Sequence, residues 1–195
     1  MKKISFSELK NIYDYEKVRI EFRNQIIKIK KNRRIQIGNN ITLVFENRET
    51  VIFQVQEMMR LEKLVDRKLI QQEIDIYNQL IPEKNQLCAT MLIEIQERQY
   101  IKPILDSLSG LNDKCVFLEF DNEKVEPIFD QGQLTDGRVS AVQYLTFSLS
   151  KNQKEKFIRL GSDPKILIDH KNYTAESPFT EEMKKVLIED LLSEE

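Results

Sequence analysis

The chain has 195 residues, of which 41% are hydrophobic and 32% charged, with 5 Gly and 5 Pro. This composition is typical of one folded domain and argues against disordered, collagen-like and solenoid chains. The longest uninterrupted apolar run covers only residues 115–118, whereas a membrane-spanning helix needs ~20 apolar residues. No apolar stretch suited to a signal peptide follows the basic N-terminus, so we expect a cytoplasmic protein.

The net charge of −2 is unevenly distributed. Residues 1–34 hold 11 Lys or Arg against 4 Asp or Glu, a net charge of +7, so the rest of the chain carries −9. A basic segment of this kind can attract phosphate backbones or the acidic surface of another protein.

The first half of the sequence predicts three helices and a strand. Apolar residues spaced by three and four predict a helix over residues 13–31, and the turn at 38–40 precedes a strand over 41–45. Asn47 caps a predicted second helix that continues to about residue 65 and buries Val51, Val55, Met58 and Met59. Asp66 caps a third helix, which ends before Pro82.

The second half is richer in strand patterns. We expect strands over residues 87–95, 115–120, 139–149 and 165–169, and helices over 97–107, 151–160 and 178–192. Glycines within 131–137 indicate a mobile connection. Without a regular alternation of strands and helices, the pattern favours a single α+β domain, residues 1–195, with a mainly antiparallel sheet of about four to six strands packed with amphipathic helices.

Enzyme signatures are absent from the sequence. Cys88 and Cys115 lie 27 residues apart without a CxxC pair, so we expect reduced thiols and no structural zinc site. His170 is the sole histidine and has no second histidine at metal-ligand spacing. There is no phosphate-binding glycine loop, nucleophile elbow or Walker lysine. We therefore assign no catalytic residue, metal or cofactor.

Polar side chains in a segment also rich in core-forming residues predict a candidate polar site, because polar groups beside a core need partners. Its members are Asn47, Arg48, Gln54, Gln56, Glu57, Arg60, Tyr77, Asn78 and His170.

A second candidate is a basic patch that could bind phosphate or an acidic partner. It comprises Lys28, Lys30, Lys31, Arg33 and Arg34. The alternative interpretation is a solvated helix end, where cations oppose the negative end of the helix dipole. Because no aromatic residue is interleaved with these cations, the pattern favours the helix end over a surface for single-stranded nucleic acid.

Several segments together resemble an uncharacterised bacterial family, domain of unknown function 3501. They are the central FENRET at 45–50, QVQEM at 54–58 and RLE at 60–62, with matching stretches at 15–19, 33–34, 75–82, 89–94 and 169–173. The sequence departs from the family at Gln143, Tyr144 and Thr146, where relatives tend to show His, Phe and Arg.

The resemblance implies a redox or peroxide-defence setting, because genes of this family often neighbour those for rubrerythrin-like proteins and iron–sulfur oxidoreductases. The leading hypothesis is an accessory or binding protein with such a partner. A nucleic-acid-binding module using the basic N-terminal segment is the second hypothesis. A small-molecule enzyme around Glu57, Arg60 and His170 is the third.

Overall fold

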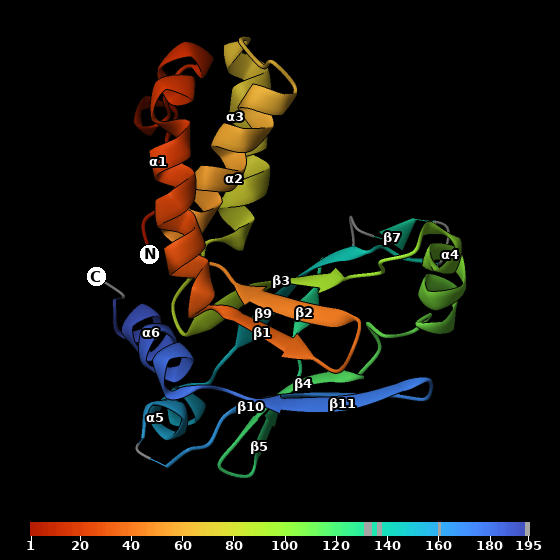
Figure 1. The fold of residues 1–195 in the computed structure, drawn as a ribbon. Coiled ribbons are helices and arrows are strands. Elements are labelled where there is room, and N and C mark those ends of the chain that lie inside the picture. The colour runs from red at the N-terminus through yellow and green to blue at the C-terminus, as the bar shows by residue number, and fades with distance from the viewer. Residues whose placement is uncertain (131–133, 136–137, 160, 194–195) are drawn as a thin grey trace.

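The computed structural model describes residues 1–130, 134–135, 138–159 and 161–193. A helical unit stands on a β unit built from two antiparallel sheets (Figure 1). The helical unit consists of η1 (Phe6–Glu8), α1 (Ile12–Lys31), α2 (Arg48–Leu61), α3 (Arg67–Tyr77) and η2 (Asn78–Leu80).

The β unit confirms the predicted antiparallel α+β class. The five-stranded sheet has the order β1 (Arg34–Ile37), β2 (Ile41–Phe45), β3 (Gln86–Ile93), β9 (Val142–Ser148) and β6 (Ile128–Phe129). The four-stranded sheet has the order β11 (Tyr173–Pro178), β10 (Lys165–His170), β4 (Val116–Phe120) and β5 (Glu123–Val125). A short ribbon pairs β7 (Leu134–Thr135) with β8 (Arg138–Val139).

Three further helices flank the sheets. α5 (Lys151–Ile158) and α6 (Glu181–Leu192) lie at one end of the β unit, and α4 (Arg98–Ser107) lies at the other end beside β7 (Figure 1). None of the helices in the described ranges is both long and apolar enough to cross a membrane. The predicted mobile connection falls partly on residues 131–133 and 136–137, which lie outside the described residues.

The helix starts agree with the capping pattern of the sequence. The side chain of Asn47 accepts a hydrogen bond from the Thr50 amide at the start of α2, and that of Asp66 accepts from Lys68 at the start of α3. The prediction that the second helix reaches residue 65 was wrong. α2 ends at Leu61, because Lys63 adopts φ 53°, a left-handed conformation that a helix cannot continue.

Strand β11 was missed by the sequence interpretation. It pairs antiparallel with β10 along its whole length, from Lys165 opposite Pro178 to His170 opposite Tyr173. Its side chains alternate between half-buried and exposed, so it lacks the apolar alternation that marks a strand. Pro178 closes this strand, and the last helix begins at Glu181, three residues later than predicted, after the Thr180 cap.

The molecule has two hydrophobic cores. One fills the space between the sheets and α5 and α6, with Phe45, Phe147 and Phe157 fully buried. The other lies within the helical unit and includes Val51, Val55, Met59, Ile74 and Ile81. Tyr144 of β9 packs against this second core, so the helical unit rests on the five-stranded sheet.

Candidate functional site

Most of the predicted polar-site residues have hydrogen-bond partners, but the structure does not bring these residues together in one place. Two of them hold the N-terminal segment against the helices. Gln56 accepts a hydrogen bond from the backbone N of Lys10 at 2.7 Å and donates to its carbonyl at 3.0 Å. Asn78 does the same with Ile4, at 2.8 and 2.9 Å. Their amides are therefore occupied by backbone.

Arg48 and Asn47 lie at the start of α2, and their side chains also form hydrogen bonds with nearby residues of the fold. The Arg48 Nε atom donates to the carbonyl of Lys2 at 2.9 Å, and its guanidinium pairs with Glu8. Asn47 and Thr50 form a reciprocal cap, each side chain accepting from the backbone N of the other at 3.0 Å. This is the arrangement that a capping box provides at a helix start.

Glu57 is the centre of an ionic network between α1 and α2. Arg19 donates to both of its carboxylate oxygens, through Nε at 2.8 Å and Nη2 at 2.9 Å. The Tyr15 hydroxyl donates to Oε1 at 2.7 Å, and Arg60 Nη2 lies 3.4 Å from Oε2. Arg60 also faces Glu16, with Nη1 3.7 Å from the carboxylate.

This network determines the protonation of Glu57. The hydrogen bonds from Arg19 lower the pKa of Glu57 to about 2, and the Tyr15 hydroxyl and Arg60 act in the same direction against desolvation. Burial, with the neighbouring Glu57 carboxylate, raises the pKa of Tyr15. Glu57 is thus a stable anion with its lone pairs occupied, which does not suit a general base working near neutral pH.

The sequence interpretation did not include Glu46, the most buried carboxylate of this region. Its side chain is 2% exposed, and its oxygens accept hydrogen bonds from the Thr50 hydroxyl at 2.5 Å and the Thr90 hydroxyl at 2.6 Å. The available signal was its position directly after the fully buried strand β2, within the FENRET segment. Glu46 links strands β2 and β3 to the first turn of α2.

Tyr77 of α3 reaches the sheet beside this cluster. Burial, with the neighbouring Tyr144 of β9, raises the pKa of Tyr77 to about 12. The Gln54 Nε2 atom is buried without a hydrogen-bond partner among the described residues. Tyr77 therefore serves as a contact between helix and sheet, whereas Gln54 keeps an unused donor.

His170 lies in a different part of the molecule, at the end of β10 in the four-stranded sheet. It is 4% exposed, with Nε2 3.1 Å from the Ser109 carbonyl oxygen and Nδ1 accepting from the Asn172 backbone N at 3.3 Å. Nε2 joins the end of β10 to the segment after α4, and Nδ1 forms a hydrogen bond within the β10–β11 turn. The structure does not bring His170 to Glu57 or Arg60.

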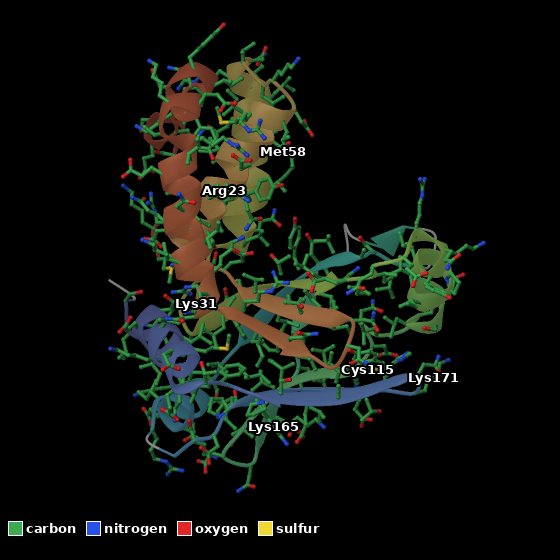
Figure 2. The ribbon with its side chains drawn as sticks, in the orientation of Figure 1. Arg23, Lys31, Met58, Cys115, Lys165 and Lys171 are labelled. Carbon is green, nitrogen blue, oxygen red and sulfur yellow. The ribbon has the colours of Figure 1, made fainter. Side chains whose placement is uncertain are left out.

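The predicted basic patch is split by tertiary contacts. Arg33 is 5% exposed and forms a bidentate ion pair with Asp190 of α6, at 2.5 and 2.8 Å. Arg34 pairs with Glu94 at 2.8 Å. The side chains of Lys28, Lys30 and Lys31 have no ion pair within the described ranges. Figure 2 shows Lys31 at the end of α1, close to α6.

An exposed apolar row on α1 was not predicted. Tyr13, Ile20 and Ile27 are 85%, 75% and 52% exposed and are spaced by seven residues. Because seven residues make nearly two helical turns, with a drift of about 20°, the three side chains line up along one face. Lys31, four residues after Ile27, lies on the same face at the end of this row, with Lys17 and Arg23 on its two sides.

Metal and thiol chemistry find little support in the described part of the chain. It contains no group of three or more His, Cys, Asp or Glu placed to hold a metal ion. Cys88 and Cys115 are free thiols, and burial raises the pKa of Cys88 to about 11, which disfavours the reactive thiolate.

Comparisons with known proteins agree with the sequence resemblance. No curated protein matches. A solved structure from Burkholderia pseudomallei K96243, described as a novel protein of unknown function, is 32% identical, with a TM-score of 0.90 over 97% of this chain and 100% of that one. The family model described as "Protein of unknown function (DUF3501)" matches residues 3–191. Covering nearly the whole length, this match shows that the chain belongs to the DUF3501 family.

Proposed function

We propose that this chain is a cytoplasmic accessory protein that binds a partner protein through the outer face of α1. The observation that carries the proposal is the exposed row of Tyr13, Ile20 and Ile27. Isolated apolar side chains are normal on protein surfaces, but an aligned row along about four turns of one helix is the pattern of an interface. Apolar anchors spaced along a helix are what a groove on a partner protein recognises.

Charge beside the row defines the partner further. Lys28, Lys30 and Lys31 lie in the last turns of α1, and Arg23 lies nearer its middle (Figure 2). A partner with an acidic rim around an apolar groove fits this surface, since complementary charge speeds encounter. The family resemblance implies a rubrerythrin-like or iron–sulfur protein as the partner, in a redox or peroxide-defence setting.

The row favours a protein over a nucleic acid as the partner. Nucleic-acid binding relies on cations along phosphates and on aromatic stacking, and isoleucines provide neither. Arg33 and Arg34, which the nucleic-acid hypothesis needs, are committed to Asp190 and Glu94. The enzyme hypothesis is weaker still, because Glu57 is saturated by Arg19 and His170 lies elsewhere.

The experiment measures association of the natural chain with purified rubrerythrin-like and iron–sulfur proteins from the same host. Ile20→Asp with Ile27→Asp should abolish binding, because charge would enter the apolar contact. Ile128→Asp is the matched control, since Ile128 is 67% exposed on β6, an edge strand of the five-stranded sheet. Its binding should equal that of the natural chain.

A second variant tests the role of charge. Changing Lys28, Lys30 and Lys31 to Glu should slow association, and the natural chain should associate more slowly as salt rises. Arg33 and Arg34 are left intact because both support the fold. No binding to either protein, or binding that survives the Ile20 and Ile27 changes, overturns the proposal. Salt-dependent nucleic-acid binding lost only in the lysine variant would replace it with the nucleic-acid hypothesis.

A further inference from the structure

A pocket of about 910 Å³ opens at the end of the helical unit. Its walls come from the segment before α1, the first turns of α1, the end of α2, the α2–α3 loop and the start of α3. Its volume falls in the range of small-molecule sites.

Most of the lining is apolar. Leu9 and Leu64 form part of it, together with the core residues Met59 and Ile70. Phe6 also lines the pocket, and the Arg67 guanidinium lies over its ring at 4.9 Å, which holds the aromatic face in place. This wall can cover a hydrocarbon chain.

The polar part of the lining is mainly cationic. Lys10, Arg60 and Lys63 contribute positive charge, and Glu16 is the acidic residue among the lining side chains. The surplus of two positive charges favours an anionic group. Glu16 reduces the surplus, so a singly charged head group fits better than a dianion such as a phosphate monoester.

The guanidinium of Arg60 has N–H donors that lack a close hydrogen-bond acceptor among the described residues. Its Nε atom is buried without a hydrogen-bond partner in the described part of the chain. Nη1 lies 3.7 Å from Glu16, and Nη2 lies 3.4 Å from a Glu57 oxygen. Glu57 is already satisfied by Arg19 and Tyr15. Because the Nε atom is out of reach of a ligand, the capacity of Arg60 for a second anion lies in its Nη atoms, whose contacts with Glu16 and Glu57 are long and whose donors match a carboxylate.

We propose that this pocket binds a monocarboxylate with an apolar chain, such as a medium-chain fatty acid. The carboxylate pairs with Arg60 and Lys63, and the chain lies against Leu9, Met59 and Leu64. This site shares Tyr13 with the proposed partner surface but requires neither Ile20 nor Ile27.

Calorimetric titration of the natural chain with dodecanoate below its micelle concentration tests the proposal. Saturable binding is expected, with weaker binding of dodecan-1-ol, which lacks the charge, and of dodecyltrimethylammonium, which reverses it. Arg60→Gln and Lys63→Gln should each weaken dodecanoate binding roughly tenfold or more, the loss of one charge-assisted hydrogen bond. Lys63 is exposed and forms no ion pair with a described residue, so we expect Lys63→Gln to leave the fold intact. Arg23→Gln, on α1 outside the pocket, should bind as the natural chain does.

A fluorescent reporter locates the site. The chain contains no tryptophan, and Val65 lines the pocket while 83% exposed, so Val65→Trp adds a single fluorophore at its mouth. Dodecanoate should shift its emission to the blue. The proposal is overturned by an absence of saturable binding, by equal binding of the uncharged or cationic probe, by unchanged affinity in both the Arg60 and Lys63 variants, or by unchanged tryptophan emission when dodecanoate binds.

Discussion

Two arginines and a tyrosine hydroxyl converge on the carboxylate of Glu57. Both Arg19 and Glu57 are largely buried, with side chains 28% and 18% exposed. A pair in this position is more than a surface ion pair, because removing one partner leaves the other partly desolvated without compensation. Glu57 therefore acts mainly in holding α1 against α2.

We expect Glu57→Gln to lower the free energy of unfolding by about 1–3 kcal/mol, because Arg19 loses its charged acceptor. Glu21→Gln is the matched control on the exposed face of α1 and should change stability by less than about 0.5 kcal/mol. Urea unfolding monitored by circular dichroism measures both. Equal stability of the two variants would contradict this role.

The same variant predicts a pH dependence. The pKa of Glu57 falls from its ordinary 4.5 to about 2 on folding, so its stabilising contribution is complete above pH 4.5 and is lost as the pH falls toward 2. The difference in the free energy of unfolding between the natural chain and Glu57→Gln should therefore become smaller as the pH is lowered from 5 to 2. A constant difference across this range would show that the charge of the Glu57 carboxylate does not contribute to stability.

Glu46 leads to a second prediction at the residue scale. Thr90→Val keeps the shape of the side chain but removes the donor to Glu46 Oε1. We expect a loss of about 1–3 kcal/mol in the free energy of unfolding, the cost of leaving a buried acceptor unsatisfied. Thr174→Val, at an exposed position of β11, is the control and should be nearly neutral. Thermal and urea unfolding of the two variants distinguish these outcomes.

At the scale of elements, the β1–β2 hairpin depends on contact with β11. Gly38 in the turn has φ +63°, and a Cβ at this position would lie 2.5 Å from the Tyr173 Oη atom. That hydroxyl donates to the Ile37 carbonyl at 2.5 Å and accepts from the Asn40 backbone N at 3.2 Å. The turn glycine thus leaves room for the tyrosine that ties the two sheets together.

Gly38→Ala should lower the free energy of unfolding by about 2–4 kcal/mol, because left-handed backbone strain and a clash with Tyr173 add together. Gly110→Ala is the control. Gly110 also has positive φ, +88°, but no atom lies within 4 Å of the position that a Cβ would take there, so only the backbone cost of about 1–2 kcal/mol is expected. Equal losses in the two variants would mean that the close approach of Tyr173 has no energetic effect.

At the scale of the whole molecule, the Arg33–Asp190 ion pair joins residues 157 positions apart in the sequence. It connects the short segment between α1 and β1 to α6, and both side chains are less than 10% exposed. A pair this buried costs desolvation to form, yet breaking it is expensive because one charge remains buried alone. The pair links the first and last parts of the chain.

Arg33→Met alone should destabilise the protein by roughly 3–5 kcal/mol, and Asp190→Leu alone should also be destabilising. The double variant should recover most of this loss, because no unpaired charge remains. Arg34→Met, which removes a half-exposed pair with Glu94, should cost less than about 1 kcal/mol. A double-mutant cycle on the free energy of unfolding measures the coupling, and additive losses would contradict it.

The local pattern of the sequence determined most of the helices and the main strands. Asn47 and Asp66 marked helix starts because a cap requires only a few neighbouring residues. The α+β class followed from the same periodicity. The ends of elements and strand β11 were harder to predict, since strand pairing compensates for a weak apolar pattern through contacts with a distant neighbour.

The arrangement of the candidate surfaces was decided by tertiary structure. The sequence interpretation grouped Arg33 with the lysines of α1. In the structure, Arg33 is buried against α6 and forms an ion pair with Asp190. The sequence interpretation also grouped Glu57 with His170, which the fold separates, and it did not reveal that Tyr13, Ile20 and Ile27 stay uncovered on α1. Periodicity shows which face of a helix is apolar, but only the packing of the other elements determines which side chains are covered and which charges meet.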